Sequence, residues 1–449
     1  MRTKNWGYAA LLIASVAAAY GAVRLGLIFY PDPAVTMPLL KAPELQAPFI
    51  RTLLTLIAVI LVSRLMGSLF LMLKQPRVIG EIIGGIFLGP SVLGALAPNV
   101  AATILPTSSL PFLSIISQIG ILLFMFLVGL ELDLPSIKKS GRAALLISHA
   151  SIVAPFLLGI GAAIFLYKGY SPPGAPFSSF ALFIGVSMSV TAFPVLARIL
   201  SDTGLSKTSV GTLALTCAAI DDATAWCLLA IVIGLLNATP VAALGTVVLT
   251  IAYVVLMIYV VGPFLRRLLP RLERSRQHIS EESLAFILVC LLISAVTTEF
   301  IGIHALFGGF LMGAIIPHES LLARDLTGRL EDLVRVFFLP AFFAFTGMRT
   351  HIGLLESSSD VLACVGLILV ATAGKFGGAY FAGRVSGLSK RDSAMIGVLM
   401  NTRGLVGLIV LNTGLDYGVL TPKLFTMLVL MAIVTTVATG PLIRILRAR

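Results

Sequence analysis

Long apolar segments follow one another along almost the entire chain, separated by charged residues, proline or glycine. A helix needs roughly 20 apolar residues to cross the hydrocarbon layer of a bilayer. The pattern therefore predicts an all-α polytopic membrane protein with about 13 to 14 transmembrane helices. We expect them near residues 7–30, 48–73, 78–98, 110–131, 142–168, 176–200, 206–237, 240–267, 281–298, 300–317, 331–350, 358–385, 391–413 and 422–446.

Lysine and arginine gather in every second connection between these segments, near residues 74–77, 138–142, 198–207, 266–276, 324–329, 390–391 and 444–449. Cytoplasmic loops carry such an excess of positive charge. These connections and the C-terminus are therefore expected in the cytoplasm. We also expect the chain to lie in a bacterial inner membrane. Residues 1–47 fit either a leading helix or a signal-peptide-like segment, followed by an outer loop.

The chain contains a weak copy of itself. VIGEIIGGIFLGP (78–90) aligns with GIHALFGGFLMGA (302–314), FMFLVGLELD (124–133) with FFAFTGMRTH (342–351), and IGVSMSVT (184–191) with IGVLMNTR (396–403). The matches keep their order, which indicates two repeats of six helices, 48–237 and 281–446, joined by the helix near 240–267. An odd number of crossings between equivalent helices inverts the second repeat, as in many secondary transporters.

Two of the expected helices carry polar residues and helix breakers near their centres. Pro194 follows the hydroxyl residues Ser189 and Thr191 in SMSVTAFPVLAR. The equivalent stretch of the second repeat contains Asn401, Thr402, Arg403 and Gly404. Unwound backbone at membrane depth is tolerated where it lines a cavity or is buried in protein. The coincidence in both repeats predicts two broken helices that meet at an ion site.

Composition agrees with a lipid environment, because 58% of the residues are hydrophobic, 12% are charged and the mean hydropathy is +1.03. The net charge of +12 falls in short clusters between apolar segments, which does not fit nucleic-acid binding. The four cysteines lie inside apolar segments without CxxC spacing, and soluble-enzyme motifs are absent. We therefore expect no cofactor and no enzymatic activity.

Four ionisable residues stand near the centres of expected spans: Asp221, Asp222, Lys375 and Arg403. Each costs about 2.5–3.5 kcal/mol at the bilayer centre, so such groups are retained either as a structural salt-bridge network or for function. Neighbouring residues on a helix point about 100° apart. One aspartate can thus face a basic partner while the other faces an ion path. A carboxylate that holds either a proton or a metal cation is the minimum requirement for exchange.

These motifs together resemble the monovalent cation:proton antiporter-2 family. The resemblance rests on KQPRVIGEIIGGIFLGPS (74–91), FLVGLELD (126–133), MSVTAFPVLARIL (188–200), AAIDDATAW (218–226), AGKFGGA (373–379) and NTRGLVGLIVLNTG (401–414), and it covers nearly all of residues 48–446. It implies a homodimer, two crossed unwound helices and an elevator-like shift of a moving core. The scaffold or dimerisation helices would be 48–140 and 281–354, the core 141–237 and 355–449, and the linker helix and cytoplasmic loop 238–280.

The resemblance also implies residue roles. Asp222 would be the transient Na⁺ or K⁺ ligand and the proton carrier, Asp221 its partner, and Ser189 and Thr191 the polar lining. Lys375 and Arg403 would compensate charge around the crossed helices. The choice between Na⁺ and K⁺ stays open. Two alternatives of other classes also stay open: a passive cation channel, and a symporter of organic anions on a related fold.

Overall fold

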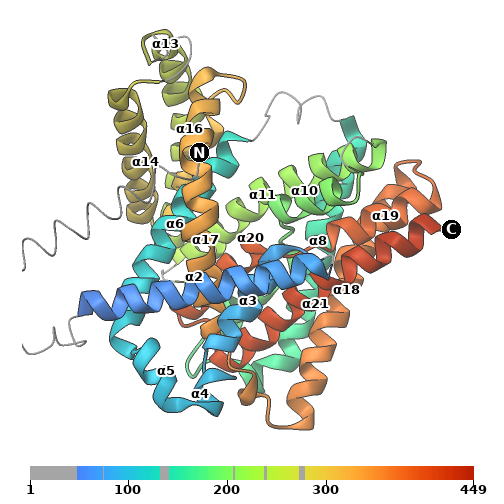
Figure 1. Ribbon diagram of the computed structural model, residues 1–449. Coiled ribbons are helices and arrows are strands. Elements are labelled where there is room, and N and C mark those ends of the chain that lie inside the picture. The colour runs from blue at the N-terminus through green and yellow to red at the C-terminus, as the bar shows by residue number, and fades with distance from the viewer. Residues whose placement is uncertain are drawn as a thin grey trace, which may run out of the picture. The chain divides into compact units, whose positions relative to one another are not determined.

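The computed structural model describes residues 48–73, 75–131, 141–205, 208–236, 240–272 and 279–448 (Figure 1). The expectations for a leading helix or signal-peptide-like segment at 1–47 lie outside the described residues. Within the described ranges all regular secondary structure is helical, which confirms the predicted fold class.

The first half contains α2 and α3, two short helices, α6, and then α8 to α11. Their bounds are α2 Pro48–Met72, α3 Arg77–Leu88, α4 Leu93–Leu96, α5 Pro98–Ile104, α6 Leu110–Leu130, α8 Gly141–Tyr170, α9 Phe177–Ser189, α10 Phe193–Asp202 and α11 Ser209–Leu236. A linking helix follows, formed by α12 Pro240–Leu256, a π-helical turn Met257–Val261 and α13 Gly262–Leu272.

The second half repeats this order. Its helices are α14 Glu281–Ile301, α15 Ala305–Ala314, α16 Leu321–Leu333, a π-helical turn Val334–Phe338, α17 Leu339–Met348, α18 Ser358–Val385, α19 Lys390–Met400, α20 Leu405–Asp416 and α21 Pro422–Ala448. Each span expected from residue 48 onward therefore lies on one or more helices. The expected spans 176–200 and 391–413 are each divided into two helices.

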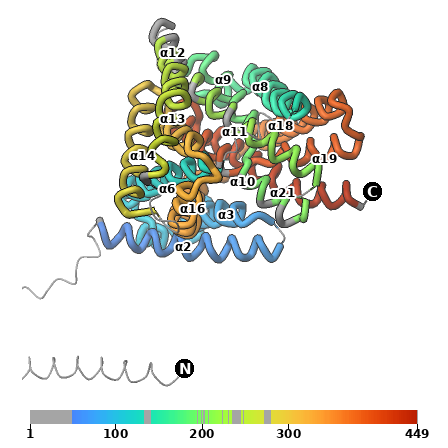
Figure 2. Tube along the Cα trace, turned by 90° about the horizontal axis from the view of Figure 1, so that it is seen from above, coloured from blue at the N-terminus to red at the C-terminus, as the bar shows by residue number. Residues whose placement is uncertain are grey.

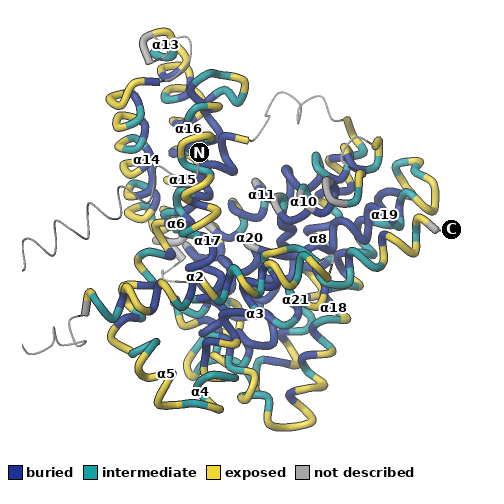
Figure 3. Tube along the Cα trace, in the orientation of Figure 1, coloured by how far each residue is buried: buried dark blue, intermediate teal, exposed yellow. Residues whose placement is uncertain are grey.

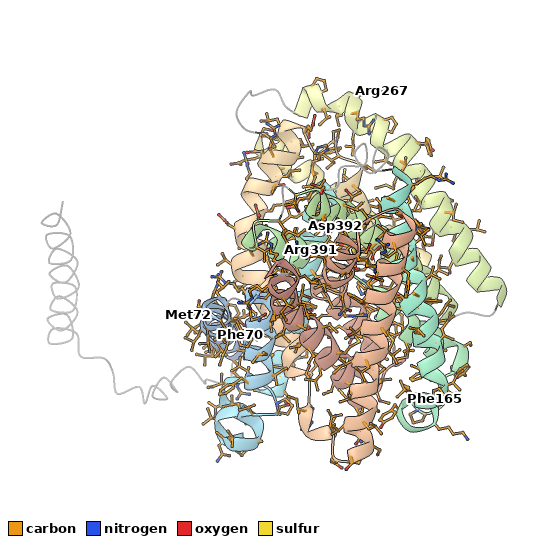
Figure 4. The ribbon with its side chains drawn as sticks, turned by 90° about the vertical axis from the view of Figure 1, so that its right-hand side faces the viewer. Phe70, Met72, Phe165, Arg267, Arg391 and Asp392 are labelled. Carbon is orange, nitrogen blue, oxygen red and sulfur yellow. The ribbon has the colours of Figure 1, made fainter. Side chains whose placement is uncertain are left out.

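The burial pattern suits a lipid environment. Nine helices in the described ranges are long and apolar enough to cross a membrane. Burial is concentrated on central elements such as α11 and α20, whereas α2 and α5 carry many exposed positions (Figure 3). Met72 on α2 and Phe165 on α8 are 80% and 87% exposed and lie at the periphery (Figure 4). Large exposed apolar side chains of this kind are favourable when the surrounding solvent is lipid.

Glycine allows two pairs of helices to approach until their backbones touch. Gly85 of α3 lies against the backbone of Ala344 in α17, and Gly347 of α17 lies against the backbone of Ile82 in α3. In the same way, Gly129 of α6 packs on the α15 backbone. The sequence repeat equates α3 with α15 and α6 with α17. The two contacts are therefore copies of each other, as a duplicated architecture requires.

A second pair of matching contacts lies in α8, α9, α18 and α19. The Phe156 ring of α8 packs against Gly185 of α9, and the Phe376 ring of α18 packs against Gly397 of α19 with nearly the same geometry. Figure 2 shows α8 and α18, which contact each other directly, beside α19. These two aromatic contacts make α8 and α18 equivalent, and they place Lys375 where the first repeat has a proline, Pro155.

The close glycine contacts predict a stability difference between two similar substitutions. In Gly129→Ala the new methyl group would overlap the Phe310 carbonyl, and overpacking of this kind costs about 1–3 kcal/mol. Gly161→Ala, inside α8, would meet nothing within 4 Å and should be neutral or stabilising by up to about 1 kcal/mol. Thermal unfolding of the detergent-solubilised protein measures both. Equal unfolding midpoints for the two variants would show that the α6–α15 contact is looser than described.

Candidate functional site

Two helices are interrupted at the centre of the molecule. α9 ends at Ser189, Val190 is extended (φ −71°, ψ 131°), and α10 begins at Phe193. α19 ends at Met400, and α20 begins at Leu405 after a short unwound segment. Both interruptions fall where the sequence repeat placed polar residues and helix breakers, so the prediction of two broken helices is confirmed.

The two interruptions cross and bond to each other. The amide of Ala192 donates to the carbonyl of Thr402 at 3.2 Å, and Thr191 Oγ1 donates to the carbonyl of Met400 at 3.3 Å. Thr402 Oγ1 in turn donates to Thr439 Oγ1 of α21 at 3.4 Å. Main-chain groups freed by the breaks thus find partners across the crossing, as backbone groups buried away from water require.

Asp221 of α11 is completely buried beside this crossing and accepts hydrogen bonds at both carboxylate oxygens. Its Oδ1 accepts from Ser148 Oγ at 2.5 Å. Its Oδ2 accepts from Ser151 Oγ at 2.9 Å, Thr191 Oγ1 at 2.7 Å and Lys375 Nζ at 2.9 Å. Charge-assisted hydrogen bonds of this number satisfy an ionised carboxylate.

Asp222 has a contrasting environment, although it is the next residue on the same helix. Its side chain is 2% exposed. In the described part of the chain, no donor lies within hydrogen-bonding geometry of either carboxylate oxygen. The charges and dipoles that act on it are the carboxylate of Asp221, the ammonium of Lys375 and the backbone amide of Phe193 at the start of α10. The expectation that the aspartates occupy different environments agrees with this arrangement.

Two cations cover the C-terminal end of α9. Lys375 Nζ donates to the carbonyl of Ser189 at 2.5 Å as well as to Asp221. Arg403 donates to the carbonyls of Ser187 and Met188 at 3.0 Å and 2.6 Å. The end of a helix carries partial negative charge and unpaired carbonyls, so both cations lie where that charge is concentrated.

The remaining predicted site residues lie around the same crossing. Ser189 is buried, and its hydroxyl donates to the carbonyls of Ile152 and Gly185 rather than to an aspartate. Asn401 is buried, and its Oδ1 has no partner among the described residues. Gly404 precedes α20 in extended conformation against Val195. Pro194 is the second residue of α10, and its side chain lies outside the described part.

The sequence did not identify Ser148 and Ser151 as residues of this site. They lie three residues apart on α8, so their hydroxyls reach Asp221 from one face of that helix. Serines are common in membrane helices, so their presence alone does not indicate a site. The contact of these two with Asp221 follows only from the packing of α8 on α11. No group of three or more histidine, cysteine, aspartate or glutamate side chains that could hold a resident metal occurs among the described residues.

Residues 53–448 match the family model described as sodium/hydrogen exchanger, transmembrane. This chain belongs to the sodium/hydrogen exchanger family. The prediction of a cation:proton antiporter family is therefore confirmed. So is the predicted function class, exchange of a monovalent cation for protons.

Similar proteins occur in bacteria, plants and yeast. The chain is 46% identical over 393 residues to the Na⁺/H⁺ antiporter NhaS4 of Synechocystis. This alignment covers 87% of this chain and 96% of the relative. It is 40% identical to cation/H⁺ antiporter 17 of Arabidopsis thaliana and 38% identical to K⁺/H⁺ antiporter 1 of Saccharomyces cerevisiae. These matches cover 87% and 86% of this chain, but only 48% and 45% of the relatives.

The fold is also that of a solved antiporter. The sodium proton antiporter MjNhaP1 from Methanocaldococcus jannaschii superposes with a TM-score of 0.66. The alignment covers 90% of this chain and all of that one, at 14% identity. The shared architecture at this low identity confirms the predicted antiporter fold.

The environment of Arg403 predicts a large loss of stability when its charge is removed. Arg403→Met would leave the carbonyls of Ser187 and Met188 buried without donors, at a cost of roughly 2–5 kcal/mol. Arg384→Met is the matched control, because Arg384 also donates to a carbonyl, that of Leu388, but is exposed. Thermal unfolding should show a drop of several degrees for the first variant and little change for the second. Similar decreases in the unfolding midpoint of both variants would mean that the Arg403 contacts contribute no more to stability than the exposed contact of Arg384.

Proposed function

We propose that Asp222 is the residue that binds a proton and a monovalent cation in turn, and that this alternation is the exchange reaction. The observation that carries the proposal is the contrast within one pair of carboxylates. Asp221 accepts four hydrogen bonds, whereas Asp222 is buried and has no hydrogen-bond partner among the described residues.

An unpaired carboxylate in a low-dielectric environment is costly while it is ionised. Binding of H⁺ removes the charge, and binding of Na⁺ or K⁺ balances it. Because both use the same oxygens, they compete, and occupancy by one excludes the other. Mutual exclusion at one group is sufficient to couple opposite movements of the two ions when the group faces each side of the membrane in turn.

The other residues keep this group in position and balance its surroundings. The ammonium of Lys375 compensates Asp221, while Ser148, Ser151 and Thr191 donate to the same carboxylate. We infer that Asp221 keeps these partners through the cycle and that Asp222 alone changes its ligand. Arg403 holds the end of α9 and does not contact either aspartate by any hydrogen bond described.

We further infer that the helices divide into two bodies, as the family resemblance implies. Residues 48–140 and 281–354 form the scaffold, 141–237 and 355–449 the moving core, and 238–280 the linker. The close backbone contacts support this division. α3 with α17, and α6 with α15, lie within the scaffold, whereas α8 with α9 and α18 with α19 lie within the core.

We also infer a homodimer in a bacterial inner membrane, with the C-terminus in the cytoplasm, and transport without chemical conversion of any substrate. The resemblance supports the dimer, and the distribution of lysine and arginine supports the orientation. The mass of the detergent-solubilised protein, measured by light scattering, should be twice the chain mass of 47.5 kDa. A single-chain mass in mild detergent would contradict the dimer.

Reconstituted vesicles with an internal pH dye test the role of Asp222. A pulse of Na⁺ or K⁺ outside the vesicles should drive proton efflux through the wild-type protein, and Asp222→Asn should reduce this efflux to the level of protein-free vesicles. The asparagine amide is neutral, so it can neither take up a proton nor balance the charge of a cation. Asp392→Asn is the matched control, because this aspartate is only partly buried, lies in the first turn of α19 and should leave exchange unchanged.

Exchange at the wild-type rate by a folded Asp222→Asn variant would rule out this assignment. The same vesicles distinguish antiport from a channel. Cation flux down its gradient with no accompanying proton movement would indicate a passive pore instead.

A further inference from the structure

Two cavities lie between the proposed scaffold and the core, at opposite ends of their boundary. One has a volume of about 320 Å³ and is lined by residues of α2, α3, α6, α17 and the π-helical turn before α17, together with Val195 of α10. The other, of about 300 Å³, is lined from both bodies by residues that include Ile121, Glu299, His304, Arg349, Asn412 and Asp416. The 320 Å³ cavity lies at the beginning of α3, and the 300 Å³ cavity lies where α17 and α20 end.

Polar side-chain bonds link the two bodies at the second cavity, in addition to apolar packing. Arg349 directly follows α17, whose backbone is packed on α3. Its guanidinium forms an ion pair with Asp416, with 2.5 Å between Nη2 and Oδ1, and it also donates to Asn412 Oδ1 at 3.0 Å. Asn412 and Asp416 both belong to α20, the second half of a broken helix.

A third bond completes the bridge. The Asn412 amide donates to Thr346 Oγ1 of α17 at 2.8 Å, so the two helices are joined by bonds in both directions. Asn412 is 7% exposed, whereas the side chains of Arg349 and Asp416 are 24% and 51% exposed. A partly exposed ion pair contributes only modestly to stability. It can therefore break and re-form in each cycle, which a glycine-mediated backbone contact cannot.

We propose that Arg349, Asn412 and Asp416 form a latch that holds one end of the ion pathway closed, and that this end opens when the latch breaks. The inference rests on the proposed division into scaffold and core. It assigns a role to a set of residues that do not touch the aspartate pair. In the inferred orientation the latch lies at the outer end, because α17 and α20 both end opposite the cytoplasmic connection at 385–390.

Accessibility of a cysteine deep in the latched cavity tests this proposal. Ile121 of α6 is 3% exposed and lines the cavity. In the Ile121→Cys protein, reaction with a membrane-impermeant thiol reagent is followed by peptide mass spectrometry, which separates this site from the native cysteines. Asp416→Asn and Arg349→Gln should each raise the labelling rate about two- to fivefold, the range by which loss of a partly exposed pair shifts an equilibrium. Asn412→Ala should raise it as well.

The chain offers a matched control on the same face. Lys423 and Asp360 form an ion pair of 2.9 Å between α21 and α18, both in the core. Lys423→Gln breaks that pair without affecting the boundary and should leave the labelling rate unchanged. The charge exchange Arg349→Asp with Asp416→Arg should return the rate toward that of the starting protein.

Unchanged labelling in all three latch variants, each folded by size-exclusion chromatography, would overturn the proposal, and so would an equal increase in Lys423→Gln. Labelling needs no transport, so the outcome is independent of the Asp222 assignment. If Asp222→Asn exchanges ions normally while the latch variants label faster, the carrier assignment fails and the latch stands.

Discussion

The structure depends on an unequal sharing of hydrogen-bond donors between two adjacent carboxylates. Asp221 and Asp222 are consecutive on α11, and both are buried, but the donors of α8, the α9 break and α18 all point at the first. A helix makes this possible because successive side chains leave it in different directions. The protein thus holds the Asp221 carboxylate through several bonds, whereas the oxygens of Asp222 accept no hydrogen bond from the described residues.

The crossed helices follow from the same constraint. Broken helices expose carbonyls and amides inside a medium that offers no water, so each group must find a partner in the protein. Lys375 and Arg403 meet carbonyls at the end of α9, while α10 directs its first amide, that of Phe193, toward Asp222. The charged residues and the unwound backbone therefore compensate one another, and neither would be stable alone.

Much of this could be predicted from the sequence, because apolar length, glycine and proline positions and buried charges are local properties of the chain. The spans from residue 48 onward, the two breaks and the set Asp221, Asp222, Lys375 and Arg403 were found in this way. The distribution of donors could not be found. Ser148 is 73 residues from Asp221, and Arg349 is 67 residues from Asp416. Such pairings depend on how helices rotate and pack, which hydropathy does not encode.

The two repeats have different residues at one pair of equivalent positions, Pro155 and Lys375, and this difference affects the relative free energies of the transport conformations. A perfectly duplicated transporter with inverted halves would have inward and outward conformations that are related by a two-fold axis in the membrane plane and have equal free energy. Here one half places the Lys375 ammonium at the crossing, whereas the other has Pro155, which packs against Gly374 of α18. The symmetry is thus broken beside the buried aspartates, so the empty carrier should rest preferentially on one side of the membrane.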